Sequence, residues 1–404
     1  MGGILRVPAE ILIKIASLIQ TETDGVAYPN PSLAGLRIHP YLDTIRKTVE
    51  FEHRVVRVDL SEADPSKSLL AAMKEVMEPE EIAEGVHKYT RILEVVGWIH
   101  CWYPMENYIS VLDVHRLLTI FSKTHTLHLS RFMFALPGAS GDRDGSRDAY
   151  AHGQLQLPQI TSLKLTDVGV YVDGSEFLLD LLRMLPELGD LSLQLADDTT
   201  FPPFSLDGVE LSHLHSLTIY ETNLGHIPVY TDVIRLTASR LSVLSVSFRE
   251  YWVDPAHFWP PFTDIILTNL RDVSFTIPED IWDEPCLLSA VMTSIENIVS
   301  AGRTELKTIT FTMCPPDLPW EDDRERWREF PWKDLRCIIL ALPCPAVVSF
   351  HIIGISLYPT SVPRWSVQEA KDISYDFRLF VEATKATFEN HSLDEWHRAR
   401  NTQT

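Results

Sequence analysis

Histidine and cysteine side chains are the groups of this 404-residue chain that could bind a metal or act in catalysis. The closest histidine pairs are His125 with His128 and His213 with His215, and neither pair has carboxylates or cysteines at the spacing of a metal site. Cys344 lies between two prolines with no histidine near it in sequence, and the chain has no Cys-x-x-Cys pair. Glycine-rich phosphate loops and the common hydrolase and metalloprotease motifs are absent as well. We therefore expect a protein that is not an enzyme and that has no cofactor and no metal site.

The charge balance limits the kinds of partner. The chain has 35 basic and 56 acidic residues, which gives a formal net charge of −21. A negative charge of this size repels phosphate backbones and anionic membrane surfaces, so we expect no nucleic acid and no membrane as partners, although the charge also serves solubility. The five cysteines are irregularly spaced, and neither a secretory signal nor a membrane-spanning run is evident. A reducing compartment, the cytoplasm or the nucleus, fits these features.

One spacing of apolar residues, L-x-x-L-x-x-L-x-L, recurs along most of the chain. The final L-x-L alternates with a period of two, which places both apolar side chains on one face of a short strand. From residue 127 onward these strands are 26 to 39 residues apart, and leucine-rich repeats are typically about 20–29 residues long. Clear copies of the whole pattern lie at 157–165, 185–193 and 211–219, and looser copies lie at 241–246, 267–275, 306–311 and 342–350. The final L-x-L occurs alone at 93–95 and 127–129.

Segments between these strands carry a helical period. Apolar residues at 177–185 and at 287–298 each form one helical face, and the second helix is expected to end at Gly302. We therefore expect an α/β leucine-rich-repeat solenoid over residues 61–365, an irregular horseshoe of parallel strands with helices on the convex side. A doubly wound sheet would also combine parallel strands with crossover helices, but the repeated L-x-x-L lead-in favours the solenoid.

Polar residues that flank the L-x-L positions would face the concave side of such a solenoid. Serine and threonine dominate there, which suits hydrogen bonding to a partner more than electrostatic capture, although both also tolerate an exposed strand. An aromatic insertion at 249–262 could supply interface anchors, although aromatic residues of loops also pack against the coil edges. The candidate contacts for a protein client are His128, Lys164, Gln194, Tyr220, Tyr251 and Trp252.

The C-terminal segment, residues 366–404, is expected to close the open end of the stack. Its apolar stripe predicts one amphipathic helix, and the acidic polar face of that helix argues against membrane binding. The stripe consists of Val367, Ala370, Ile373, Phe377, Phe380 and Val381. Upstream, Trp320, Trp327 and Trp332 lie in a segment that we assign to an acidic, charged loop whose charges form a solvated face.

The N-terminal segment begins with Val-Pro-Ala-Glu-Ile-Leu at residues 7–12 and continues with apolar residues to Ile19. This run resembles the first helix of an F-box, whose usual beginning is Leu-Pro-x-Glu-(Ile/Leu)-Leu, and residues 33–45 lie where the family has its next helices. The segment departs from the family pattern by an insertion at 21–31, by Pro40, and by the absence of the Cys/Ser-Arg-x-Trp element. With repeats downstream, the chain resembles divergent F-box proteins of fungal type that carry leucine-rich repeats.

The resemblance implies a substrate-recognition adaptor of a Skp1–cullin–F-box ubiquitin ligase. An F-box-like helical segment at residues 1–60 would bind a Skp1-like protein, the repeats would bind an unknown protein client, and the chain would be a monomer outside the complex. The alternative is a stand-alone interaction scaffold in which the same N-terminal residues only cap the stack. The residues of the apolar helix face that would contact Skp1 are Val7, Pro8, Ile11, Leu12, Ile15 and Leu18.

Overall fold

The computed structural model describes residues 44–48, 52–59, 89–98, 108–109, 111–134, 156–170, 175–195, 209, 211–222, 227–248, 265–278, 281, 285–302, 305–313, 328–354 and 367–392. The chain divides into two compact units, the first formed by Met1–Leu188 with Gly208–Glu210 and the second by Gly189–Asp207 with Leu211–Thr404. The expected domain boundaries after residues 60 and 365 lie outside the described residues.

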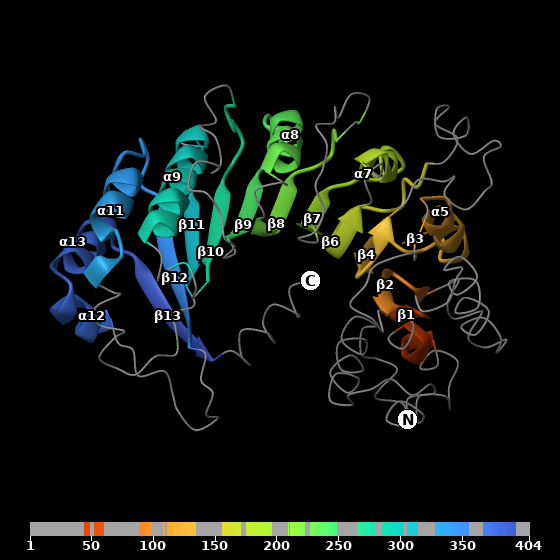
Figure 1. Cartoon of the computed structure of the whole chain (residues 1–404), viewed down its shortest axis with the longest axis horizontal. Coiled ribbons are helices and arrows are strands. Elements are labelled where there is room, and N and C mark those ends of the chain that lie inside the picture. The colour runs from red at the N-terminus through yellow and green to blue at the C-terminus, as the bar shows by residue number, and fades with distance from the viewer. Residues whose placement is uncertain are drawn as a thin grey trace, which may run out of the picture. The chain divides into compact units, whose positions relative to one another are not determined.

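The first unit contains parallel strands in the order β1-β2-β4-β6. Two short strands, β3 and β5, form a second ladder with the end of β6. Helices α5 and α7 lie on one side of these strands (Figure 1). The elements are β1 His53–Asp59, β2 Ile92–Trp98, β3 Tyr108–Ile109, α5 Val111–Ile120, β4 Thr126–Ser130, β5 Met133–Phe134, β6 Ser162–Val170 and α7 Ser175–Arg183.

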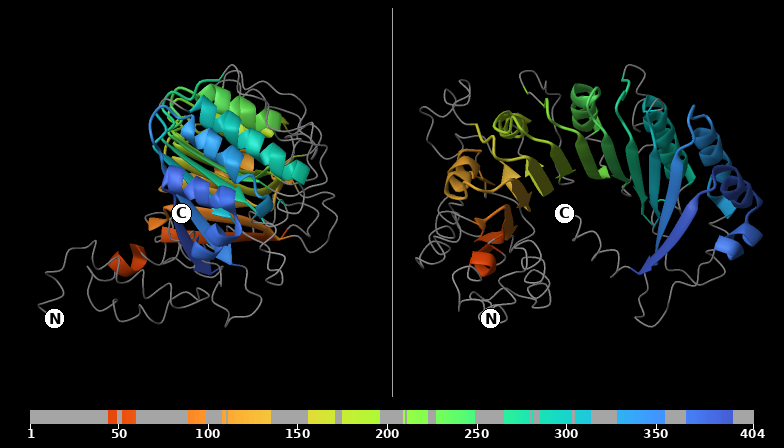
Figure 2. Two further views of the ribbon diagram at one scale, coloured as in Figure 1. Left: turned by 90° about the vertical axis from the view of Figure 1, so that its left-hand side faces the viewer. Right: turned by 180° about the vertical axis from the view of Figure 1, so that it is seen from behind.

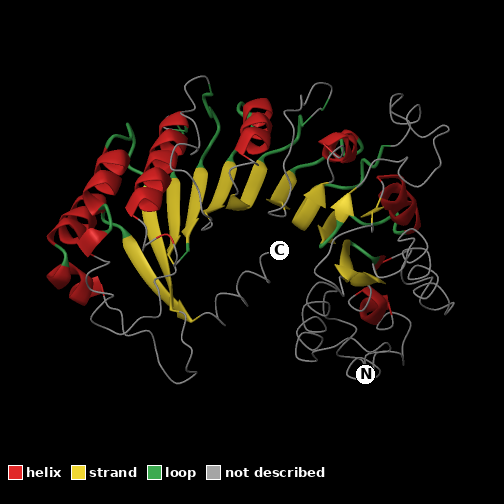
Figure 3. Ribbon diagram, in the orientation of Figure 1, coloured by secondary structure: helices red, strands yellow, loops and turns green. Residues whose placement is uncertain are grey.

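The second unit has the same plan, with strands in the order β7-β8-β9-β10-β11-β12-β13 and parallel pairing between described neighbours. Its helices α8, α9, α11 and α13 lie side by side on one face of this sheet (Figures 2 and 3). The elements are β7 Asp190–Leu195, β8 Ser216–Thr222, α8 Ile227–Thr237, β9 Val243–Phe248, β10 Asp272–Ile277, α9 Pro285–Ala301, β11 Thr308–Met313, α11 Trp332–Leu340, β12 Val347–Gly354, α12 Val367–Ile373, α13 Tyr375–Thr384 and β13 Thr387–Ser392. The expected α/β class with parallel strands is confirmed.

The strands follow the predicted alternation. In β7, Leu191, Leu193 and Leu195 are buried while the residues between them are half-exposed, and β9 and β10 repeat this pattern. Every L-x-L pair of the sequence pattern is buried, because its two side chains point to the face that the helices cover. The opposite face of each sheet, which carries no described helix, is called the open face below.

The L-x-x-L lead-in has a structural cause as well. Its second apolar residue donates a backbone hydrogen bond to the first, as in Leu188 N to Leu185 O at 3.2 Å and Leu214 N to Leu211 O at 3.2 Å. The chain therefore turns once before each strand, and both leucines of the turn point into the core with exposed fractions of 6% or less. Residues just after the turn bond to the preceding coil, as in Ser242 N to His215 O at 2.8 Å. These bonds fix the register of consecutive strands.

A row of stacked phenyl rings runs through the core of the second unit. Phe275, Phe311, Phe350 and Phe388 occupy matched positions on β10 to β13. The centroid distances along this row are 5.6, 4.8 and 4.7 Å, with interplanar angles of 26° or less. Such offset stacks add favourable interaction beyond the area they bury. The four rings thus pack in register with the strands that carry them.

Trp332 lies in a helix and not in the charged loop that the sequence predicted, whereas Trp320 and Trp327 lie outside the described residues. It is fully buried at the start of α11, with its ring 4.6 Å from Phe377 and 5.4 Å from Phe380 between centroids. Charged residues near it in sequence, such as Lys333 and Asp334, are exposed. The loop assignment is wrong because it rested on the charged residues. The helical spacing of the apolar residues Trp332, Leu335 and Ile339, all of which are buried, indicates a helix instead.

The C-terminal segment also differs from its prediction. The expected single helix is two helices, because Ser374 interrupts the chain with an extended backbone and its hydroxyl accepts a hydrogen bond from Phe377 N. A further strand, β13, follows and pairs with β12. The buried stripe residues Ala370, Phe377 and Phe380 nevertheless face the core as expected. Helices α5, α8 and α11 were not predicted from the sequence.

Candidate functional site

A row of hydroxyl side chains crosses the open face of the second unit. Its seven members lie at matched positions on β7 to β13, one per strand, and are called the hydroxyl row. Six of the seven residues are half-exposed and the last is exposed. The members are Ser192, Thr218, Ser245, Ser274, Thr310, Ser349 and Thr387.

Neighbouring hydroxyls of this row bond to one another. Ser245 Oγ lies 2.6 Å from Ser274 Oγ, and Thr310 Oγ1 lies 3.1 Å from Ser349 Oγ. Each hydroxyl has one proton to donate and two lone pairs to accept with, so a hydroxyl bonded once to its neighbour keeps capacity for a ligand. Except at Ser192, whose hydroxyl oxygen is buried, the row therefore offers uncharged, short side chains that allow a close approach by a partner's polar groups.

The first unit carries charged groups on its open face instead. Glu94, His128 and Lys164 occupy matched positions on β2, β4 and β6. His128 Nδ1 lies 3.5 Å from Glu94 Oε1, and His128 Nε2 lies 2.9 Å from Thr166 Oγ1. The His128 and Glu94 side chains are 18% and 25% exposed, so this group is partly screened from water.

The order carboxylate, imidazole, hydroxyl in Glu94, His128 and Thr166 is the order of side chains in nucleophilic triads. Here the 3.5 Å between Glu94 and His128 is longer than an ordinary N–H···O hydrogen bond, so the carboxylate acts on the imidazole mainly as a nearby charge. Together the two contacts restrain the ring on both sides. The arrangement suits a fixed imidazole that contacts a bound partner.

Two left-handed backbone positions lie next to this group, one directly after β4 and one within β6. Arg131 has φ 59° directly after β4, and Asp167 has φ 53° directly after Thr166. Arg131 N donates to Thr166 O at 2.9 Å, and Gly169 N donates to Phe132 O at 2.8 Å. The left-handed turns at Arg131 and Asp167 are thus joined by hydrogen bonds between the two neighbouring segments. They change the direction of the chain after His128 and Thr166. No residue type in the sequence signalled it.

A second histidine pairs with a carboxylate near the other end of the described chain. His351 Nδ1 of β12 lies 3.5 Å from Glu389 Oε2 of β13, at matched positions of the two strands. The His351 side chain is 24% exposed and that of Glu389 is 63% exposed. This pair was not predicted from the sequence, because the strand that carries Glu389, β13, was not predicted.

The predicted client contacts are distributed over both units. His128 and Lys164 are register partners, as the repeat spacing implied. Gln194 on β7 and Tyr220 on β8 are half-exposed members of the second unit. Tyr251 and Trp252 lie outside the described residues, as do all six residues of the predicted Skp1 contact face, Val7, Pro8, Ile11, Leu12, Ile15 and Leu18.

The histidine pair His213 and His215 forms no candidate metal site. His213 is exposed, and His215 Nε2 lies 3.8 Å from Asp190 Oδ1, with both side chains more than half exposed. Within the described ranges, no three side chains of histidine, cysteine, aspartate or glutamate gather as metal ligands would. Among the described helices, none is both long enough and apolar enough to cross a membrane.

The comparisons with known proteins add no family. No family model matches the chain, and no curated protein matches it.

Proposed function

We propose that this chain is a leucine-rich-repeat protein that serves as the substrate-recognition adaptor of a Skp1–cullin–F-box ubiquitin ligase in the cytoplasm or the nucleus. The observation that carries the client-binding half is the hydroxyl row, a polar surface that repeats once per strand across the second unit and that no described helix covers. Sequential strand order supports the solenoid, because doubly wound sheets have helices on both faces and a strand order that reverses.

The ligase half of the proposal rests on the likeness of residues 7–19 to the first F-box helix. An amphipathic helix of this kind binds by laying its apolar face into a partner's groove. In the proposal, Val7, Ile11 and Ile15 enter Skp1, and the repeats present the client to the rest of the ligase.

Binding of purified Skp1 to the full chain tests this half directly. Isothermal titration should give a Kd of about 1 μM or tighter, and the double variant Ile11→Asp, Ile15→Asp should lose that binding. The control is Ile266→Asp, Leu340→Asp, which places the same two changes at side chains that are 65% and 57% exposed. Circular dichroism confirms that both variants remain folded. An intact chain that does not bind Skp1 refutes the adaptor role.

The client half has a separate test, in which proteins retained from cell extract by the wild-type chain and by variants are quantified. Ser245→Arg with Thr310→Arg places bulk and charge on the open face and should release a client. Thr268→Arg with Ser239→Arg makes the same charge change at exposed turn positions away from that face and should not. Equal retention by both variants contradicts a client on the hydroxyl row.

A stand-alone scaffold is the second candidate, and one observation favours it. The short helix at 44–48 has Ile45 and Arg46 buried at 4% and 2%. The next described element after it is β1, which pairs with β2 of the first unit. Residues that pack in this way would also cap the strands. The Skp1 titration separates the two functions, because a scaffold with a simple N-terminal cap does not bind Skp1.

A further inference from the structure

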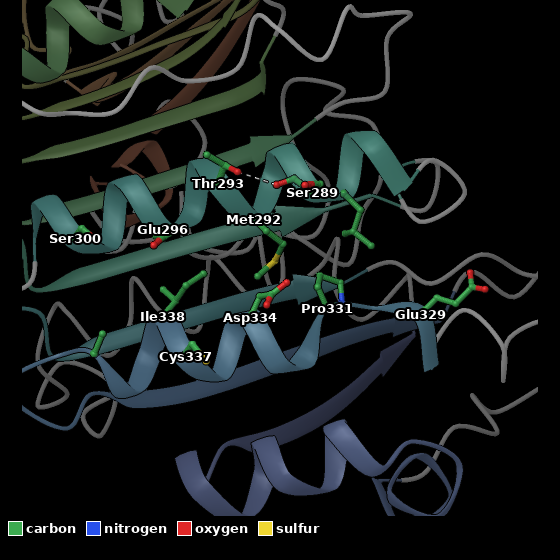
Figure 4. Close-up of a pocket in the computed structure, with 12 residues that line it drawn as sticks. Ser289, Met292, Thr293, Glu296, Ser300, Glu329, Pro331, Asp334, Cys337 and Ile338 are labelled. Atoms are coloured by element: carbon green, nitrogen blue, oxygen red, sulfur yellow. Dashed lines mark hydrogen bonds between the residues drawn. The ribbon is translucent and has the colours of Figure 1, made fainter.

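A cleft of about 580 Å³ lies between helices α9 and α11, on the helix-covered face of the second unit and away from the hydroxyl row (Figure 4). The lining of the cleft is mixed. Its apolar part, called the floor below, consists of Leu288 and Met292 from α9 with Pro331 and Ile338 from the α11 segment, and Ser289, Thr293 and Ser300 of α9 add hydroxyl groups. Leu288 and Met292 are buried, at 6% and 5%, while Ile338 is half-exposed. The accessible apolar surface of the cleft is therefore mainly that of Ile338 and of Pro331, which is also half-exposed.

The cleft forms between the two helices because each helix turns one face toward the core and a neighbouring face toward the other helix. Helix α9 buries Val291, Ile295 and Ile298, and α11 buries Trp332, Leu335 and Ile339. The cleft is lined by the neighbouring faces, with lining positions 288, 292, 296 and 300 on α9 and 334, 337, 338 and 341 on α11. These spacings of three and four residues each form one continuous helix face.

The rim of the cleft is acidic. Glu296 stands on the α9 side, and Glu329 and Asp334 stand on the α11 side. All three are exposed, and no lysine, arginine or histidine lines the cleft. Within the described part of the chain, none of the three carboxylates forms an ion pair. The carboxylates flank the apolar floor on both sides.

We infer that this cleft binds a basic amphipathic helix of a partner protein. A third helix can lie along the groove between two neighbouring helices, because its apolar face then enters the groove. Its leucine-like side chains cover the half-exposed Pro331 and Ile338. Lysine or arginine side chains that flank this apolar face meet Glu296 on one side and Asp334 on the other. The partner is chosen by charge, because an acidic helix of the same shape would be repelled.

The experiment uses the full chain and a fluorescein-labelled, stapled helical peptide of leucine and lysine as the probe. The same peptide with glutamate in place of lysine is the charge control. Fluorescence anisotropy should show saturable binding of the lysine peptide only. Ile338→Asp should also weaken that binding, because it places a charge on the apolar floor without opening the buried core.

Because the whole chain carries a charge of −21, general attraction of a basic peptide must be separated from binding in the cleft. The variant Glu296→Gln, Glu329→Gln, Asp334→Asn should weaken binding by about tenfold or more. The matched variant Glu305→Gln, Asp272→Asn, Asp372→Asn removes three exposed carboxylates elsewhere in the second unit and should change the affinity less than about twofold. Equal weakening by both variants overturns the inference.

Two exposed thiols locate the bound peptide. Cys337 lines the cleft, whereas Cys344 lies in the turn after α11, and both are free and exposed. Alkylation followed by peptide mass spectrometry should show Cys337 protected by the lysine peptide and Cys344 unprotected. If Cys337 resists alkylation in the monomeric chain without peptide, residues of the chain itself cover the cleft. If protection of Cys337 instead follows self-association, a second copy occupies the cleft. Either result would overturn the inference.

Discussion

Trp332 is the largest of the fully buried side chains in the described structure, and it joins three elements of the second unit. Its ring lies 4.4 Å from Phe330, 6.0 Å from Phe350 and 4.6 Å from Phe377 between centroids. One residue thus connects α11, the phenyl row and α13. At the residue scale, the stability of the C-terminal part of the second unit depends on such single large side chains.

Trp332→Ala should lower the free energy of unfolding by about 3–5 kcal/mol, because it removes a large buried ring and leaves a cavity among aromatic neighbours. Urea unfolding followed by circular dichroism measures the change. Leu340→Ala, on the same helix but 57% exposed, is the control and should change the free energy by less than about 0.5 kcal/mol. A Trp332→Ala change within about 1 kcal/mol of the control would contradict the burial of the ring.

Gly302, directly after α9, is needed for a close approach to Leu270. A Cβ added at Gly302 would lie 2.7 Å from Leu270 Cδ2 and 3.3 Å from Leu270 Cβ, and the Leu270 side chain is fully buried. Gly302→Ala should therefore cost about 1–3 kcal/mol, whereas at an unstrained site it would stabilise slightly. In a Leu270→Ala background the same change should cost less. Equal costs in both backgrounds would show that the contact is not the cause.

At the element scale, α12 and α13 are separated by a specific cap. The Ser374 hydroxyl accepts from Phe377 N at 3.3 Å, and Lys385 ends α13 in a left-handed conformation with φ 55°, its N–H bonded to Val381 O. Both ends of α13 thus satisfy backbone groups that a helix leaves unpaired. These local interactions set the boundaries that allow Phe377 and Phe380 to reach the core.

Ser374→Ala should destabilise the protein by about 1 kcal/mol, since the N–H of Phe377 loses its acceptor at a position where water has little access. Ser374→Thr keeps a hydroxyl at the cap and should cost less. Thermal unfolding compares the two variants, and hydrogen exchange of the first-turn amides of α13 gives a local measure. If alanine and threonine behave alike, the cap contributes nothing at this site.

At the scale of the whole molecule, each unit presents two different surfaces. Helices cover one face of the strands, and the open face bears hydroxyls in the second unit and a Glu94–His128–Lys164 row in the first. The whole chain carries an excess of 21 negative charges. Mutual repulsion of these charges opposes the compact state, and added salt reduces it.

Raising NaCl from 0.1 M to 1 M shortens the screening length from about 10 Å to about 3 Å, so the Tm should rise by a few degrees. Calorimetry at both concentrations measures the shift. KCl should give the same rise if screening is the cause, and a difference between the salts would indicate binding of a particular ion. A fall in Tm would mean that attractive ion pairs outweigh the repulsion.

Local spacing in the sequence was enough to predict the strands that carry the L-x-L pattern, whereas β3, β5 and β13 were not predicted. The buried pairs Leu191 with Leu193 and Leu217 with Ile219 could be identified because alternation along a strand is a property of the strand alone. His128 and Lys164 were expected to occupy equivalent positions of the repeat for the same reason, and they are register partners. The parts of the candidate site that follow from repeat spacing were therefore predictable.

Tertiary structure decided what repeat spacing does not encode. The contact of His128 with Thr166, the break at Ser374 and the burial of Trp332 depend on where irregular segments return to the core. The cleft between α9 and α11 depends on which face each helix buries, and one-dimensional charge patterns do not reveal that. By itself, the sequence determined a parallel α/β repeat with a polar strand face, because strand alternation is local. Which polar and apolar groups meet across the strands and helices was decided only by packing, because those contacts join residues that are far apart in the chain.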